Sequence, residues 1–297
     1  MLAPAYRVAL AAQWQGGDED LLIALHARRS APAVAAWRRA HPARPLLLTL
    51  TGTDLYRDID CDNGAQAALA SADALVVLNE LGPQRLPAAL RGKCHIVLQS
   101  CGQRRTLAKT ARHLRVLMVG HLRDEKDPLT YLRAAQRLAG RGDIRFDHIG
   151  AALDPALGAQ AAALAALQPN YRWLGALPHA SARRHIQAAH VLVHASRMEG
   201  GANVIVEALR SGTPVIASNI DGNLGLLGGG YTGQFQVGDD FALAALLQQA
   251  RDDPDMLPGL QGRCALRAPL FAPEAEAAAL QGIVAGLLAH RNPETPA

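Results

Sequence analysis

The sequence predicts an α/β protein with two doubly wound parallel-sheet domains. Short runs of aliphatic residues alternate with Ala- and Leu-rich helical stretches through the 297 residues, as expected where helices connect parallel strands. The alternation stops once, at residues 99–114, which have no apolar period and carry five basic residues when His113 is counted. It restarts at Leu114, so the chain reads as two α/β halves joined by a linker.

The first half is expected to contain a parallel sheet whose opening unit is reduced. A doubly wound domain usually opens with a strand, a glycine-rich turn and a helix. Here AAQWQGGDED leads from the first apolar run directly into the next. We therefore predict a domain over residues 1–108 that is shortened at its N-terminus. Its expected strands are residues 6–10, 20–26, 45–51, 74–78 and 95–99.

The second half repeats the pattern, and we assign residues 109–275 to it. Pro273 with Glu274 and Glu276 marks the start of a last helix, because proline and acidic residues favour a first turn. Residues 276–297 are expected to form a C-terminal helix that packs back toward the first domain. The expected strands of the second half are residues 114–120, 145–150, 171–175, 190–195 and 214–218.

Composition and charge argue against several classes of protein. The net charge of +4 is small and evenly spread, which does not suit a nucleic-acid surface. No apolar run reaches the roughly 18 residues of a membrane span, and the opening residues do not resemble a secretory leader. The cysteines show no metal-ligand spacing. We expect a cytoplasmic monomer or homodimer with neither a nucleic-acid nor a membrane partner.

One strand–helix–strand unit carries two unusual carboxylates. In SRMEGGANVIVEALRSGTPVIAS, residues 196–218, a glycine loop after a strand leads into a helix with Glu199 before it and Glu207 within it. Ligands of such sheets bind beyond the carboxyl ends of the strands, where the N–H groups of a helix start attract anions. Gly200, Gly201 and Ala202 are expected to let a diphosphate approach the backbone. The carboxylates suit hydroxyl groups, for which they are hydrogen-bond acceptors.

A purely structural interpretation of the same residues stays open. Glu199 would then be a solvated loop acid, and Glu207 a helix-surface acid paired with Arg210 three residues on. The helix is apolar on most faces, however, which leaves Glu207 few solvated directions. We therefore favour the functional interpretation.

These segments resemble the retaining glycosyltransferases of family 4, which have the two-domain GT-B fold with a cleft between two Rossmann-like domains. EGGANVIVE is similar to that family's E-x7-E motif, and the resemblance covers most of the chain. VGHLRDEKDP resembles the segment with the diphosphate-binding lysine, here Lys126, and YRWLGALP the segment whose backbone meets the nucleotide base. The family usually has arginine where this chain has His121, and Arg123 is expected to supply the missing charge.

A narrower resemblance links the chain to the selenosugar synthases of selenoneine biosynthesis. TGTDLYRDI and DGNLGLLG, read with the segments above, carry it. Those enzymes join selenophosphate to the sugar of a UDP-sugar, and the family's N-terminal glycine loop is missing here. The resemblance implies that Glu207 holds the ribose hydroxyls and Glu199 the donor sugar. The implied catalytic residues are Glu199, Lys126 and Arg123, and the implied nucleotide-sugar residues are Glu207, Gly200, Gly201, Ala202, Asn203, Gly120, His121, Leu174 and Gly175.

Two strand ends of the first half are candidates for acceptor binding. ALHARRSA and TGTDLYRD follow neighbouring expected strands, so their polar residues meet at one edge of the sheet. Arginines and backbone N–H groups suit a small dianion such as selenophosphate. Alternatively, Arg28 is a solvated helix-start residue and Asp54 only an N-cap. The candidate acceptor residues are His26, Arg28, Thr51, Gly52, Thr53, Asp54 and Arg57.

We predict no metal and no cofactor besides the UDP-sugar, UDP-N-acetylglucosamine or UDP-glucose, as donor substrate. No pair of aspartates stands at a strand end where Mg²⁺ is expected. Three functions stay open. They are a selenosugar synthase, a family 4 glycosyltransferase that acts on a hydroxyl acceptor, and a protein that binds a UDP-sugar without catalysis.

Overall fold

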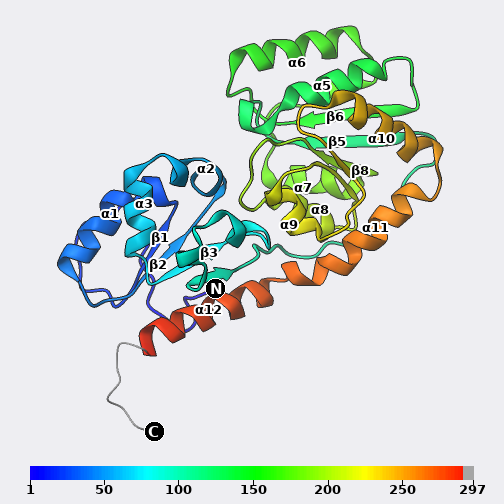
Figure 1. Cartoon of the computed structure of the whole chain (residues 1–297). Coiled ribbons are helices and arrows are strands. Elements are labelled where there is room, and N and C mark those ends of the chain that lie inside the picture. Colours follow the sequence, from blue (N-terminus) through cyan, green and yellow to red (C-terminus); the bar gives the residue numbers. More distant parts are fainter. Residues whose placement is uncertain (290–297) are drawn as a thin grey trace. The chain divides into compact units, whose positions relative to one another are not determined.

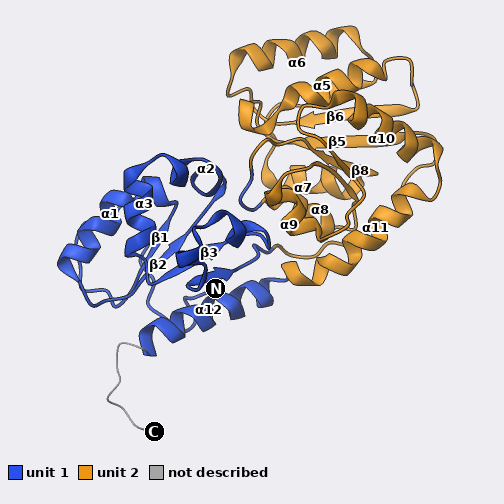
Figure 2. Ribbon diagram, viewed as in Figure 1, with its two compact units in different colours: residues 1–100, 199–201, 272–297 blue, residues 101–198, 202–271 orange. Residues whose placement is uncertain are grey.

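The computed structural model describes residues 1–289 and divides the chain into two compact α/β units (Figure 2). Of the described residues, unit 1 takes in Met1–Ser100, Glu199–Gly201 and 272–289, and unit 2 takes in Cys101–Met198 and Ala202–Phe271. All paired strands in both units are parallel. No helix within residues 1–289 combines the length and the apolar composition of a membrane span.

Unit 1 is a four-stranded sheet covered on both faces. The strands β1 (Leu22–Leu25), β2 (Leu46–Thr49), β3 (Ala74–Val77) and β4 (Cys94–Ile96) pair in sequence order. The central strands read as continuous apolar runs because neither face meets water. The helical elements of unit 1 are α1 (Ala27–Ala40), α2 (Gly52–Tyr56), η1 (Asp58–Asp60), α3 (Asn63–Ser71), η2 (Gly82–Arg85), α4 (Ala88–Arg91) and α12 (Pro273–Ala289).

Two apolar layers hold these helices to the sheet of unit 1 (Figure 1). On one face, the fully buried Trp37 of α1 and residues of α3 pack against Leu46 and Leu48 of β2. On the other face, Leu280 and Ile283 of α12 pack against a cluster that contains Leu47. Alternate residues of β2 therefore serve opposite layers, as the two-residue period of a strand requires.

The predicted first strand, residues 6–10, is wrong. This segment has no strand structure, and its side chains are mostly exposed, with 48% of Val8 and 96% of Leu10 accessible. An apolar run becomes a strand only where it gains hydrogen bonds and burial from a neighbour, and β1 forms the edge of the sheet instead. After this segment, the Trp14 side chain packs edge-on against Trp37 of α1 and connects the N-terminal residues to the core of unit 1.

Unit 2 is a six-stranded sheet in the order β10-β9-β8-β5-β6-β7. Its strands are β5 (Leu114–Val119), β6 (Ile144–Ile149), β7 (Tyr171–Trp173), β8 (Val191–His194), β9 (Val215–Ser218) and β10 (Gln234–Phe235), the last of which we did not predict. Its helical elements are η3 (Asp124–Lys126), α5 (Pro128–Arg137), α6 (Pro155–Leu167), α7 (His179–Ala188), α8 (Asn203–Leu209), α9 (Asp221–Leu227), α10 (Asp240–Asp252), α11 (Met256–Arg267) and η4 (Ala268–Phe271). The strand order reverses between β5 and β8.

Aspartates begin several of these helices. The Asp62 side chain accepts a hydrogen bond from Ala65 N at the start of α3, and the Asp239 side chain accepts one from Ala242 N at the start of α10. Asp154 does the same for α6. An N-cap of this kind satisfies one of the free N–H groups of a first turn.

An aromatic cluster fills the core beneath β5, β6 and β7. The hydroxyl of buried Tyr131 donates to the carbonyls of Val116 and Asp147, tying α5 to two strands. His148 Nδ1 lies 3.1 Å from the Tyr171 hydroxyl. Because His148 is buried, desolvation lowers its pKa to about 4.

The buried imidazole predicts acid sensitivity of the fold. Between pH 6.5 and about 4, His148 binds a proton in the unfolded chain but not in the native state. The free energy of unfolding should therefore fall as the pH falls through this interval, with little contribution from His148 above pH 6.5. Urea titrations at several pH values measure this, and His148→Gln should flatten the dependence. An unchanged slope in that variant would assign the sensitivity to other groups.

Candidate nucleotide-sugar site

The candidate site in unit 2 lies at the point where the strand order reverses. From β5 the chain runs outward through β6 and β7, and it then returns to the other side of β5 as β8. Open parallel sheets bind ligands outside the carboxyl ends of the strands at such a point. The chain leaves β5 through Gly120 and His121, and it leaves β8 into the SRMEGG segment. The switch point therefore falls where the sequence predicted nucleotide binding.

Backbone hydrogen bonds join the ends of β5, β6 and β7. Gly120 N donates to Ile149 O at 2.8 Å, and Gly150 N donates to Gly175 O at 2.8 Å. Leu174 N donates to His148 O, also at 2.8 Å. The structure thus brings the predicted residues Gly120, Leu174 and Gly175 to adjoining strand ends.

Gly150, which the sequence did not single out, is required for this arrangement. A Cβ at this position would lie 1.9 Å from Gly120 O, a backbone atom that cannot rotate away. Gly150→Ala should lower the free energy of unfolding by at least about 1 kcal/mol and weaken UDP binding, because the β5 and β6 ends must separate. Urea unfolding and calorimetry measure both. Gly140→Ala is the control, since an added Cβ there meets nothing within 4 Å, and equal effects in the two variants would contradict the steric argument.

Lys126 ends the short η3 turn, and its aliphatic stem lies beside Gly120. A Cβ on Gly120 would be 3.6 Å from the Lys126 Cγ and Cδ atoms, which is ordinary contact. Arg123 precedes the turn and lies 3.8 Å from the Glu125 carboxylate. His121 Nδ1 accepts a hydrogen bond from Ala151 N at 3.0 Å. The four residues predicted from VGHLRDEKDP therefore belong to one segment at the end of β5.

Arg197, which the sequence analysis missed, fastens the loop after β8 to this segment. Its backbone N donates to Glu125 O at 2.9 Å, and its guanidinium lies 3.1 Å from the Asp127 carboxylate. Asp127 is buried, has a left-handed backbone (φ 45°) and accepts a hydrogen bond from the Thr130 hydroxyl. The residue after Lys126 is thus fixed from both sides. An aspartate before Pro128 at a helix start was the available sequence signal.

Removing the Arg197 guanidinium should disturb Lys126 through Asp127. Arg197→Met keeps the aliphatic stem but leaves a buried carboxylate with one partner fewer. We expect turnover to fall by about three- to tenfold, the size of one lost hydrogen bond. Steady-state kinetics measure this, and Arg133→Met on an exposed position of α5 is the control. Equal turnover of the two variants would show that Arg197 is dispensable.

The predicted glycines of the EGG segment belong to unit 1 and pack closely against other residues of that unit. A Cβ on Gly200 would lie 2.4 Å from Thr51 C, and a Cβ on Gly52 would lie 2.8 Å from Gly200 N. Asn79 Nδ2 donates to Gly200 O at 2.8 Å. Gly201 likewise faces Leu78 Cβ, at 2.8 Å from the added carbon. These close approaches give a packing reason for both glycines in addition to the predicted approach of a diphosphate.

Glu207 is buried in α8, which begins at Asn203 after Ala202, and its partner differs from the one that the structural interpretation expected. His179 Nε2 lies 2.6 Å from Glu207 Oε1. Arg210 instead donates to the carbonyls of Cys101 and Ala268. His179 is the first residue of α7 and was not predicted, because nothing in the local sequence links it to a residue so far along the chain.

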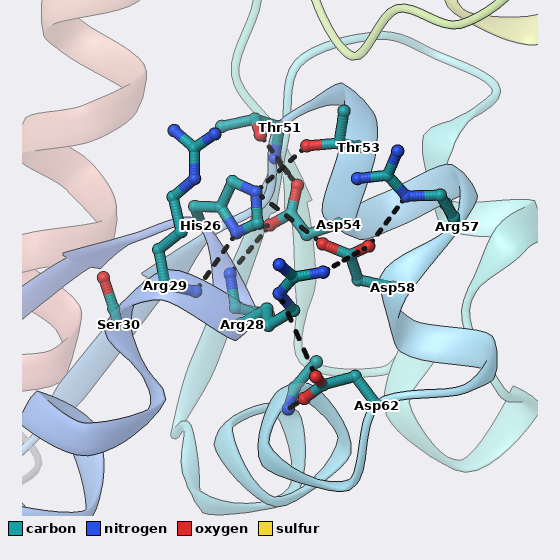
Figure 3. A network of polar contacts seen from close by, with 12 residues as sticks. His26, Arg28, Arg29, Ser30, Thr51, Thr53, Asp54, Arg57, Asp58 and Asp62 are labelled. Carbon is teal, nitrogen blue, oxygen red and sulfur yellow. Dashed lines mark hydrogen bonds and ion pairs between the residues drawn. The ribbon is translucent and has the colours of Figure 1, made fainter.

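The candidate acceptor residues other than Gly52 form one polar network in unit 1 (Figure 3). His26 Nε2 lies 3.0 Å from Thr53 Oγ1. Asp54 is fully buried and accepts hydrogen bonds from Thr51 N, Thr51 Oγ1 and Ala27 N at 2.7–2.8 Å. The contacts of Asp54 join the starts of α1 and α2. The N-cap of α2 is Thr51, and Asp54 is the third helical residue of the same capping box, so the interpretation of Asp54 as an N-cap is wrong.

Asp58, another residue that the sequence analysis missed, forms ion pairs with both candidate arginines, Arg28 and Arg57. Its buried Oδ1 lies 2.9 Å from Arg57 Nε and 3.4 Å from Arg28 Nη1. About half of each arginine side chain stays accessible, 53% for Arg28 and 48% for Arg57. His26, with a φ of 72°, lies beside the same carboxylate at 3.9 Å. Strained backbone of this kind costs energy and often accompanies function.

Comparison with known proteins finds a family match for most of the unit 2 sequence. Residues 113–253 match the family described as glycosyl transferases group 1. The match covers less than half of the 297 residues, and it shows that this part of unit 2 is similar in sequence to the group 1 glycosyl transferases. No curated protein sequence matches the chain.

Several solved structures have a similar fold, and their matches cover residues of both units. TarM of S. aureus, a mutant in complex with Fondaparinux, alpha-GlcNAc-glycerol and UDP, has a TM-score of 0.70 and 11% identity; the match covers 90% of this chain and 55% of that one. Sucrose-phosphate synthase of Thermosynechococcus elongatus has a TM-score of 0.74 and 20% identity, and the match covers 91% of this chain and 74% of that one. Anabaena Alr3699/HepE in complex with UDP-glucose has a TM-score of 0.70 and 18% identity, and the match covers 91% of this chain and 79% of that one. The predicted fold class, two parallel-sheet Rossmann-like domains as in GT-B proteins, is confirmed.

Proposed function

We propose that this protein transfers the sugar of a UDP-sugar to a hydroxyl group of an acceptor. The observation that carries the proposal is that the group 1 glycosyl transferase match, residues 113–253, contains the switch point of unit 2, where Lys126 lies beside Gly120 at the end of β5. Two structures of similar fold were solved with UDP or UDP-glucose, which supports a UDP-sugar as the donor.

The chemistry of sugar transfer suits the residues of unit 2. Breaking the bond between sugar and phosphate leaves additional negative charge on the diphosphate, which a fixed cation and backbone N–H groups stabilise. Lys126 and Arg123 are cations of the required kind, and Asn203 begins α8. Glu207 accepts hydrogen bonds from the ribose hydroxyls and Glu199 from those of the donor sugar. Within residues 1–289, no cluster of three His, Cys, Asp or Glu residues is arranged to hold a metal ion.

Selenophosphate is the second candidate acceptor, and one observation favours it. Arg28 and Arg57 converge on Asp58 while about half of each side chain stays accessible. A guanidinium has five donors, so both arginines can bind a small dianion while they keep the contact with Asp58. Nothing in the comparisons points to this acceptor, and we therefore rank it below a hydroxyl compound.

Release of UDP from UDP-glucose and from UDP-N-acetylglucosamine tests these functions. The protein is incubated with each donor and either a panel of sugar and polyol acceptors or selenophosphate, with and without EDTA. Release that depends on a hydroxyl acceptor supports the proposal, and release that depends on selenophosphate supports the second candidate. Binding of UDP without release under any condition would contradict both. Inhibition by EDTA would contradict a metal-free reaction.

A further inference from the structure

The Glu207 carboxylate has a side-chain partner whose role the proposed function does not explain. His179 Nε2 lies 2.6 Å from Glu207 Oε1. We infer that His179 is a positioning residue, which holds the Glu207 carboxylate in the orientation that receives the ribose hydroxyls. This inference rests on the proposed function, because it takes Glu207 as the ribose-binding residue.

The nearby arginines have other partners. Arg210, three residues after Glu207 on α8, donates to the carbonyls of Cys101 and Ala268. Arg183, four residues after His179 on α7, is buried and donates to Gly102 O at 2.9 Å. Arg183 thus contacts the start of unit 2, and Arg210 contacts both its start and its C-terminal part. The imidazole of His179 is left to orient the carboxylate.

The position of His179 suits this role. It is the first residue of α7, which packs against α8, and Pro178 before it restricts the backbone at the helix start. The same connection contains Leu174 and Gly175, which are expected to meet the base. One short segment after β7 therefore carries both the residues that face the base and the residue that orients the ribose-binding carboxylate.

The contact with His179 leaves hydrogen-bond acceptors of the Glu207 carboxylate for ribose. An ionised carboxylate accepts hydrogen bonds but cannot donate them, so the hydrogen between the two groups lies on His179 Nε2. This contact occupies one lone pair of Oε1. The other oxygen and the remaining lone pairs suit the vicinal hydroxyls of a ribose, which are donors.

The accessibility of His179 separates positioning from a contribution to the stability of the fold. Its side chain is 75% exposed, and a pair with such an exposed partner adds little to the stability of a fold. A glutamate that must be ordered when the ligand arrives weakens binding, and a glutamate held beforehand avoids that cost. The expected gain is about three- to tenfold in affinity, the equivalent of ordering one side chain.

Replacement of His179 tests the inference through a split between affinity and turnover. His179→Ala should weaken UDP binding about three- to tenfold and raise KM for the UDP-sugar equally, while kcat and the melting temperature stay unchanged. His179→Gln should recover most of the affinity, because its amide nitrogen takes the place of Nε2. Calorimetry with UDP and steady-state kinetics measure these quantities. Arg184→Ala, an exposed position on α7, is the matched control.

A double-mutant cycle with Glu207→Ala separates the possible failures. If His179 acts through Glu207, His179→Ala should have no further effect on UDP affinity once Glu207 is removed. A loss that persists in the Glu207→Ala background would mean that His179 contacts the nucleotide itself, which overturns the inference. Unchanged or tighter binding by His179→Ala alone would also overturn it. Unchanged binding by Glu207→Ala would instead overturn the assignment of Glu207 in the proposed function.

Discussion

Lys126→Met should lower kcat by about 10²–10³, the usual effect of removing one group that stabilises charge in a transition state. The diphosphate gains negative charge as the sugar leaves, so an ammonium group beside it interacts more strongly with the transition state than with the bound donor. Methionine keeps an apolar side chain of similar length beside Gly120 and removes the ammonium group. Affinity for the UDP-sugar should consequently fall much less than turnover.

Steady-state kinetics at saturating donor, together with calorimetry on UDP, separate the two effects. Arg133→Met removes a positive charge from an exposed position of α5 and should change neither quantity. If Lys126→Met raised KM while kcat stayed intact, Lys126 would contribute uniform binding to donor and transition state. The assigned role in leaving-group stabilisation would then be wrong.

Much of the fold could be predicted because parallel strands covered on both faces are written as unbroken apolar runs. LLLT in β2 and VLVH in β8 are examples. The two errors in the predicted strands arise because an apolar run alone does not decide whether a strand forms. Residues 6–10 have the composition of a strand without a neighbour to pair with, and β10 has only two residues, too few to show a period.

Some residues of the candidate site could be predicted from the sequence, and others could not. Residues that closely follow a strand, such as Gly120 after β5 and Thr51 after β2, can be predicted because the topology fixes where a strand end lies. Arg197, His179 and Asp58 could not be predicted in this way. Each acts through a partner on another element, as His179 does with Glu207, and a single sequence does not record which distant side chains meet.

Glu207→Gln should weaken UDP binding by about 10- to 100-fold with the fold intact. The substitution keeps the shape of the side chain but replaces a charged acceptor by a neutral one, and hydrogen bonds to charged groups contribute about 1.5–3 kcal/mol. Stability should change little. Glutamine fills the same volume in α8, and the one side-chain partner described above, His179, is largely exposed.

Calorimetric titration of UDP, compared with titration of free phosphate and of uridine, identifies the part of the ligand that Glu207 holds. If the carboxylate binds the ribose hydroxyls, Glu207→Gln should weaken uridine and UDP by the same factor and leave phosphate unaffected. Glu274→Gln, an exposed acid on α12, provides the charge-matched control. An equal loss of affinity in both variants would point to a general effect of charge. Unchanged affinity in Glu207→Gln would mean that Glu207 does not bind the nucleotide and has only a structural contact with His179.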